Sequence, residues 1–259
     1  MAAAPASART ADVVAFLDDL LQIDRFADYG PNGLQVPGAD TVTTVLTGVS
    51  AQRALFERAL AERAQLVLAH HGLLWDFEPR RIGAAQAARL RLLLANDVAL
   101  AGYHLPLDAH PEHGNNALLA QQLGATRHER AFPYKGEPIG VVATFDGGGI
   151  PAADLFERVR RATDREPLVF DGGPATIRTL GIVSGAAANA LSDAIDLKLD
   201  AFLTGEPKEH VMAQARENGI HFVAAGHYAT ETFGIRRLGE LVAERFGVRH
   251  VYADIPNPV

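Results

Sequence analysis

Three histidines and two carboxylates occupy positions in the sequence where they could bind metal ions. His70 and His71 end the apolar stretch LVLAHHG, Asp108 closes GYHLPLD, and His227 and Glu231 are four residues apart in AGHYATETFG. Imidazole mixed with carboxylate suits Zn, Mn, Fe or Ni ions and is too rich in nitrogen for Mg or Ca alone. Five ligands are too many for one catalytic zinc, which usually takes three. We therefore expect two divalent metal ions per chain, with Glu231 as the bridging carboxylate.

Each of these residues also has a structural interpretation. His70 and His71 could be hydrogen-bonded core residues, although burying two adjacent imidazoles is unfavourable unless both are bonded, which favours metal binding. His227 and Glu231 could be an i,i+4 pair on a solvated helix face, but the apolar stretch HFVAAG before them argues against full exposure. Asp108 follows Pro106, which disfavours regular helix, so we expect a shaped loop there. Without a metal it would be an ordinary loop residue.

Other polar residues near these positions could support the chemistry. His104 and Glu206 are the candidate catalytic residues, because either could carry a proton next to a metal-bound water. Tyr228 could orient a ligand imidazole. All three follow apolar stretches of the kind that form buried strands.

The segment DAHPEHGNN follows Asp108 directly. His110 and His113 in it could face a substrate or could simply be solvated. Asn115 and Asn116 are expected to fix the loop and the start of the next helix, because asparagine is a good helix N-cap.

The elements that must position these residues alternate between strands and helices. After a helix over about 10–21 and the Gly- and Pro-rich loop YGPNGLQVPG, strands are predicted at 41–50, 65–72 and 98–104, with helices at 51–64 and 84–97. The same order returns as strands at 176–185, 200–207 and 219–227, with helices at 186–199 and 209–218. Such alternation predicts parallel strands in an α/β sheet.

The two halves resemble each other in spacing as well as in order. Thr44 precedes His70 by 26 residues, and Thr179 precedes Gly205 by the same number. We interpret this as an internal strand-helix-strand duplication; a generic likeness between two pieces of α/β chain is the alternative. The fold class is then α/β with two α/β domains: 1–128 plus about 226–259 as the first, and 129–225 as the second. Because ligands gather at the C-terminal ends of parallel strands, the metal site is expected between them.

The composition excludes several classes of function. The net charge of -7 argues against general nucleic-acid or membrane-surface binding, since either favours a basic face. The absence of cysteine excludes disulfides, thiolate nucleophiles and cysteine-bound metal sites. The sequence shows neither a signal peptide nor an apolar run long enough to span a membrane, so we expect a soluble, cytoplasmic protein.

At these motifs the sequence resembles a known family. The stretches GLQVPG, LAHHGLLW, YHLPLDAHPEHGNNALLA, FLTGE and AGHYATETFG, in this order, are similar to the dinuclear-metal-centre hexameric proteins. These include the GTP cyclohydrolase 1 type 2 homologues and are related to the NGG-interacting-factor proteins. The family often begins its first motif with Asp-Asn-x-Gly, whereas this chain reads Tyr29-Gly30-Pro31-Asn32-Gly33. We do not expect that departure to disturb the metals.

The resemblance implies more than the residues alone indicate. It implies that His70, His71, Asp108, His227 and Glu231 are the metal ligands, matching the choice made from chemistry. It also implies two α/β domains and a homo-hexamer built as a trimer of dimers, with the metal sites facing an internal cavity.

Two functions remain open. The first is a metal-dependent hydrolase acting on a small anionic or nucleotide substrate: the family name implies attack of water on the purine of GTP, and phosphoester hydrolysis would use the same centre. The alternative is a non-catalytic metal-binding scaffold, or a metal-handling or regulatory interaction protein. Activity that depends on the metal ligands would distinguish the two.

Overall fold

The structure, a computed structural model, describes residues 6–259 of the 259-residue chain. Helices and several sheets are mixed along these residues, so the predicted α/β class is confirmed. The chain divides into two compact units. Unit 1 comprises the chain up to Leu107 together with Gly234–Ile255, and unit 2 comprises Asp108–Phe233 together with Pro256–Val259.

A five-stranded sheet with the order β15-β4-β5-β6-β2 forms the centre of unit 1. Four strands are parallel and β2 pairs antiparallel with β6 at the edge. Their bounds are β2 (Gly33–Val36), β4 (Thr44–Ser50), β5 (Leu66–His71), β6 (Ala99–Gly102) and β15 (Arg249–Tyr252). Parallel strands covered on both faces need apolar side chains on both, which explains the continuous apolar stretch of β5. The register places Ser50 opposite His71, so both lie at the C-terminal edge of the sheet.

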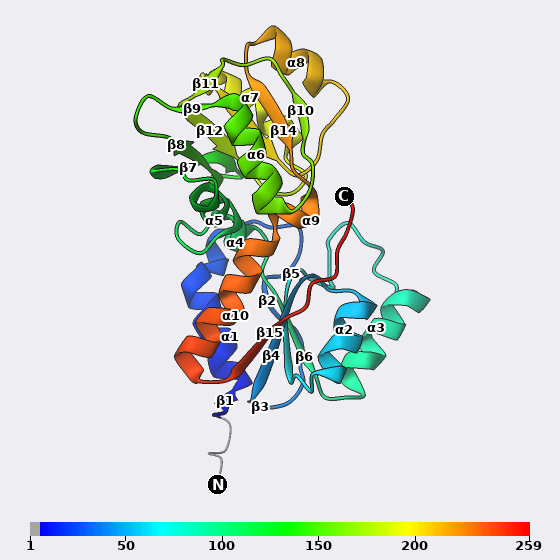
Figure 1. Ribbon diagram of the computed structural model, residues 1–259. Helices are drawn as coiled ribbons and strands as arrows, with labels where there is room; N and C mark the ends of the chain where they lie inside the picture. The colour runs from blue at the N-terminus through cyan, green and yellow to red at the C-terminus, as the bar shows by residue number, and fades with distance from the viewer. Residues whose placement is uncertain (1–5) are drawn as a thin grey trace. The chain divides into compact units, whose positions relative to one another are not determined.

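Helices cover both faces of this sheet. Figure 1 shows α1 and α10 on one side and α2 and α3 on the other. Their bounds are α1 (Thr10–Leu21), α2 (Arg53–Ala61), α3 (Ala84–Leu94) and α10 (Thr232–Phe246); a short pair, β1 (Ala8–Arg9) with β3 (Thr41–Val42), and the 3-10 turn η1 (Ile23–Arg25) complete the unit. Leu55 and Phe56 of α2 pack in one buried cluster with Leu46, Val67 and Leu100 of the sheet.

A six-stranded sheet with the order β10-β14-β13-β12-β8-β7 forms the centre of unit 2. Its three middle strands β12, β13 and β14 are parallel, and each flanking strand pairs antiparallel with its neighbour. The bounds are β7 (Arg127–Tyr134), β8 (Glu137–Thr144), β10 (Leu168–Phe170), β12 (Thr179–Ile182), β13 (Ala201–Thr204) and β14 (His221–Ala224). A separate pair joins β9 (Ile150–Pro151) and β11 (Thr176–Ile177).

Alternating side chains of these strands feed two apolar clusters. Leu180, Leu203 and Val223 pack with residues of α5 and α6, whereas Phe202 and Phe222 pack with residues of α7 and α8. This alternation is what a strand buried on both faces requires. The helices of the unit are α5 (Asn115–Gln122), α6 (Ala152–Thr163), α7 (Leu191–Asp196), α8 (Val211–Glu217) and α9 (His227–Thr230), with the turn η2 (Ala188–Ala190).

Each unit therefore contains three parallel strands in the predicted order, β4-β5-β6 in unit 1 and β12-β13-β14 in unit 2. That they arose by duplication stays a prediction. Within residues 6–259, no helix has both the length and the apolar character needed to cross a membrane.

Two local predictions were wrong. Pro106 does not keep Asp108 in a loop, because Leu105–Ala109 forms the short helix α4. Proline is tolerated in a first helical turn, where its missing N–H would have no partner inside the helix. The stretch GLQV, expected to be part of a loop, is the edge strand β2.

Candidate functional site

Three histidines of unit 1 lie together at the C-terminal ends of β5 and β6. The nitrogen atoms of His70, His71 and His104 lie within 4.8 Å of one another and could hold a metal ion. His70 is fully buried, and its ring centroid is 4.8 Å from that of His71 and 5.1 Å from that of His104. The two adjacent imidazoles thus lie side by side at the end of β5.

The Nδ1 atom of each imidazole faces a specific oxygen. His70 Nδ1 lies 2.9 Å from the carbonyl oxygen of Tyr103 and therefore donates to it. His104 Nδ1 lies 2.7 Å from Oδ1 of Asp28, and His71 Nδ1 lies 3.1 Å from the Ser50 hydroxyl. A histidine whose Nδ1–H is held by an acceptor presents the lone pair of Nε2, which is the usual arrangement of metal-binding histidines.

The loop before β2 holds His104 from two sides. Asn32 accepts the backbone N–H of His104 at 2.8 Å and donates to the Asp28 carboxylate at 2.9 Å. Oδ2 of Asp28 also accepts the N–H of Leu105 at 2.9 Å. Burial alone would raise the pKa of Asp28, but hydrogen bonds and the neighbouring His104 outweigh it and lower the pKa. The carboxylate therefore stays ionised and orients the imidazole.

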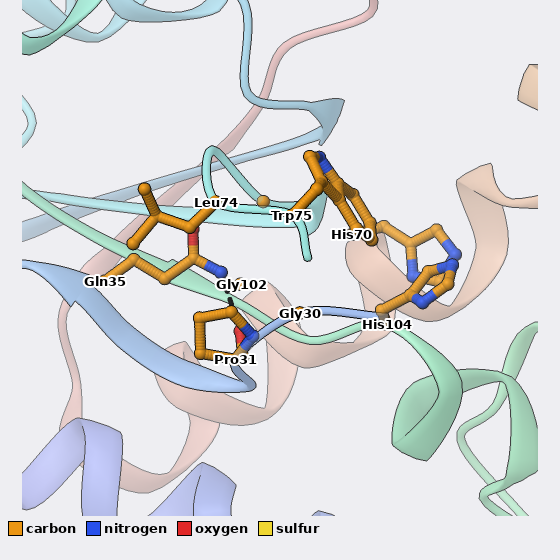
Figure 2. A pocket seen from close by; sticks show the side chains of 9 residues that line it. Gly30, Pro31, Gln35, His70, Leu74, Trp75, Gly102 and His104 are labelled. Carbon is orange, nitrogen blue, oxygen red and sulfur yellow. Dashed lines mark hydrogen bonds between the residues drawn. The ribbon is translucent and has the colours of Figure 1, made fainter. Parts of the chain in front are cut away.

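Gln35 ties this loop to the segment that follows His71. Its amide donates to the carbonyl oxygen of Pro31 at 2.7 Å (Figure 2). It also accepts the N–H of Leu73 at 2.7 Å. A Cβ atom on Gly72 would lie 2.2 Å from the Gln35 amide nitrogen, so a larger residue there would displace the Gln35 amide. The motif GLQ thereby fixes the backbone next to the two histidines.

A small hollow of about 10 Å³, large enough for about one water molecule, adjoins these imidazoles. Its lining includes His70, His104, Trp75 and Gln35, which Figure 2 shows together. The Trp75 ring meets the His104 ring edge to face at 5.1 Å and stacks on Phe77 at 5.5 Å. Aromatic rings thus shield one side of His104 from solvent.

The predicted residues of unit 2 gather at the C-terminal ends of its parallel strands. His227 begins α9 after β14, Glu231 follows that helix, and Nε2 of His227 lies 3.2 Å from Oε2 of Glu231. Nδ1 of His227 contacts the carboxylate of Glu206, which follows β13. Burial would lower the pKa of His227, but the hydrogen bonds and charges of Glu231 and Glu206 outweigh it and raise the pKa to about 9. The same negative charge would favour a divalent cation.

A buried hydrogen-bond network fixes Asp108. Its Oδ1 accepts from Asn115 Nδ2 at 2.8 Å and from the Ser184 hydroxyl at 2.9 Å. Asn116 donates to the carbonyl oxygens of Asp108 and Ile139 and accepts the N–H of Ser184. The expectation that the asparagines cap a helix was wrong, because Gly114 is the N-cap of α5 and has no side-chain cap. Asn115 instead holds the carboxylate of Asp108, and Asn116 holds its backbone carbonyl.

Other predicted residues lie close to these in sequence. The N–H of Tyr228 donates to the carbonyl oxygen of Val259 at 3.1 Å. Nδ1 of His110 accepts the N–H groups of Glu112 and His113, and the rings of His110 and His113 stack at 4.9 Å. Burial, with the charge of His113 as the next cause, lowers the pKa of His110 to about 4. A neutral His110 therefore closes this loop.

Four residues that hold the site were not indicated by any sequence motif: Asp28, Asn32, Gln35 and Ser184. Asp28 contacts a residue 76 positions away, and Ser184 contacts one at the same separation. For Asp28, Asn32 and Gln35, the one signal in the sequence was the cluster of Asn, Gln, Gly and Pro in a loop beside an apolar stretch.

Comparisons with known proteins agree with one another over nearly the full chain. Residues 8–258 match the family model described as Duf34/NIF3 (NGG1p interacting factor 3). A GTP cyclohydrolase 1 type 2 homolog from Pseudomonas aeruginosa is 43% identical over 241 residues, covering 93% of this chain and 95% of that protein.

Solved structures are similar as well. The structure of protein ybgI, described as of unknown function, has a TM-score of 0.91 at 38% identity and covers 97% of this chain and 100% of that one. A protein from Thermus thermophilus has a TM-score of 0.86 at 35% identity, with the same coverage. The predicted resemblance is confirmed, and the chain belongs to the Duf34/NIF3 family.

Proposed function

We propose that the protein is a hydrolase-type enzyme that binds two divalent metal ions through His70, His71, Asp108, His227 and Glu231. Three imidazoles and two carboxylates suit Zn, Mn, Fe or Ni ions. Glu231 is the proposed bridging ligand, since its side chain is the longer of the two carboxylates.

The way the ligands are held supports this proposal. A carbonyl oxygen faces Nδ1 of His70, the Ser50 hydroxyl faces Nδ1 of His71, and Glu206 faces Nδ1 of His227. Such outer partners fix the tautomer and orientation of metal-binding imidazoles. Gathering polar groups away from solvent is unfavourable unless they are bonded, and a bound metal would bond them. This pattern of Nδ1 contacts is the observation that carries the proposal.

Bound as a pair, the ions would lower the pKa of a water molecule toward neutrality and stabilise negative charge that develops on the substrate. Two divalent ions carry +4 against -2 from Asp108 and Glu231, so a surplus of positive charge would face the substrate. This favours a small anionic or nucleotide substrate. His104 and Glu206 are the proposed proton carriers, each already hydrogen-bonded within its own unit.

The names of the relatives add a substrate to test. Several are GTP cyclohydrolase 1 type 2 homologs, which makes GTP the first candidate and phosphoesters the second. We further propose a homo-hexamer, a trimer of dimers, with about six times the 27.7 kDa of one chain. Light scattering after size exclusion would measure that mass, and a monomer would contradict it.

The function is tested by a substrate screen with the metal-loaded protein. We expect turnover of GTP or of a phosphoester, and a loss of at least about 100-fold in Glu231→Ala because a ligand is removed. His210→Ala, which changes an exposed histidine, is the matched control and should keep full activity. If the loaded wild type is inert across the panel, the hydrolase proposal fails and a metal-binding scaffold replaces it.

A further inference from the structure

We propose that His70, His71 and His104 form a three-imidazole site that binds the first divalent ion without help from the carboxylates Asp108 and Glu231. The expected ion is a late first-row metal such as Zn²⁺ or Co²⁺, which prefer nitrogen ligands. The inference rests on the proposed metal binding and is independent of the proposed hydrolysis. It assigns His104 a ligand role that the family resemblance did not imply.

The separation of the rings fits a shared ion. An imidazole nitrogen lies about 2.0–2.1 Å from zinc, and three tetrahedrally placed rings would then have centroids about 5.2 Å apart. The centroid separations here are 4.8 Å for His70 and His71, 5.1 Å for His70 and His104, and 5.7 Å for His71 and His104. Their nitrogen atoms already lie within 4.8 Å of one another. On a shared tetrahedral ion these nitrogens would lie about 3.3 Å apart, so the rings would have to turn inward on binding.

The hydrogen bonds of His104 are those of a ligand. The Asp28 carboxylate accepts its Nδ1–H at 2.7 Å, and Asn32 accepts its backbone N–H at 2.8 Å. A carboxylate on Nδ1 makes Nε2 a stronger electron-pair donor and stops the ring from turning. His70 is held in the same way by the carbonyl oxygen of Tyr103.

All three ligands belong to unit 1, so the site is organised by one compact part of the chain. His70 and His71 are the last residues of β5, and His104 follows β6, its parallel neighbour. Three nitrogen ligands with a fourth position open to water complete a tetrahedral zinc site. We infer that this site binds its ion first; as a ligand His104 would not also carry protons, which leaves Glu206 as the proton carrier.

The experiment removes the proposed ligands of unit 2 and measures how many metal ions the chain still binds. In the triple variant Asp108→Ala, His227→Ala, Glu231→Ala, we expect one Co²⁺ per chain with the intense visible absorption of tetrahedral Co²⁺. Adding His104→Ala should weaken that binding more than about 100-fold, and adding Asp28→Asn about 10–100-fold. Adding His210→Ala, an exposed histidine, should leave it unchanged.

Two results would overturn the inference: a folded triple variant that binds no Co²⁺, or full binding after His104→Ala is added. If the triple variant does not fold, the Co²⁺ spectra of the wild type and of the single variant His104→Ala test the inference instead. The first equivalent of Co²⁺ must then give the tetrahedral spectrum in the wild type and lose it in His104→Ala; equal spectra contradict the inference. Two ions in the wild type together with none in the triple variant would refute ordered loading while leaving the proposed function intact.

Discussion

Gly185 offers a sharp test of whether Glu231 and His227 bind metal. It follows β12 in unit 2 with a φ angle of +67°, and a Cβ atom there would lie 2.4 Å from Oε1 of Glu231 and 3.2 Å from Nε2 of His227. An ordinary contact is 3.4–4 Å. In Gly185→Ala the Glu231 carboxylate must therefore move by about 1 Å, which is enough to spoil a ligand geometry.

Two separate effects are expected from this substitution. The left-handed backbone costs alanine about 1–2 kcal/mol wherever it occurs, which lowers Tm by a few degrees in a chain of this size. The displaced carboxylate should weaken metal binding about 10–100-fold, or about 1.4–2.8 kcal/mol. Only the second effect depends on Glu231 being a ligand.

Gly219→Ala separates the two effects. Gly219 lies in the same unit with a φ angle of +68°, and among residues 6–259 no atom beyond its chain neighbours lies within 4 Å of the position its Cβ would take. Both variants should therefore lose similar stability without metal, while only Gly185→Ala loses metal affinity in a competition titration against a chelating dye. Equal metal affinities in the two variants would refute the assignment of Glu231 and His227 as ligands.

Three further predictions concern stability in unit 1, each measured by urea unfolding. Burial lowers the pKa of His250 below 6.5, so as pH falls the unfolded chain takes up this proton before the folded chain does. The contribution of neutral His250 to stability is therefore complete above about pH 6.5 and is lost as pH falls toward the folded pKa. His250→Gln should flatten that decline, and an unchanged pH profile would contradict the prediction. Tyr103→Phe removes the hydroxyl that donates to Asp18 at 2.8 Å, and should cost about 1–3 kcal/mol because the half-buried carboxylate loses a donor. A neutral effect would contradict this. A Cβ atom on Gly239 would lie 2.1 Å from His250 Nε2. Gly239→Ala should therefore lower the free energy of unfolding by about 1–3 kcal/mol through overpacking, partly offset by about 1 kcal/mol gained in helix propensity. Purely additive effects of Gly239→Ala and His250→Ala would refute the clash.

The part of the fold that could be predicted is the part with strong periodic patterns. The apolar stretches before His71 and before His227 are long enough to identify buried strands, and parallel pairing then places their ends at one edge of each sheet. The edge strand at GLQV could not be predicted, because four residues beside Gly and Pro in the sequence are too few to show a periodic pattern. Its identity depends on pairing with β6.

The candidate site likewise has a part that local sequence patterns predict and a part that only the tertiary fold brings together. Adjacent histidines and the His227–Glu231 spacing are local patterns that chemistry can interpret, and in the structure the two members of each pair do meet. The partner of His104 could not be found, because Asp28 is 76 residues away and only the tertiary fold brings the two together. The side chain of Asn115 was assigned to a helix cap on local grounds, whereas the long-range need to hold Asp108 decides its contacts.

The central claim is that this chain binds two divalent metal ions, and the metal content of the purified protein tests it most directly. Apo-protein would be reconstituted anaerobically with excess Zn²⁺, Mn²⁺, Fe²⁺ or Ni²⁺, desalted, and analysed by plasma mass spectrometry against the protein concentration. We expect about two ions per chain for at least one of these metals, and a clear loss in Glu231→Ala with no loss in His210→Ala. Fewer than one ion per chain with every metal would contradict the account.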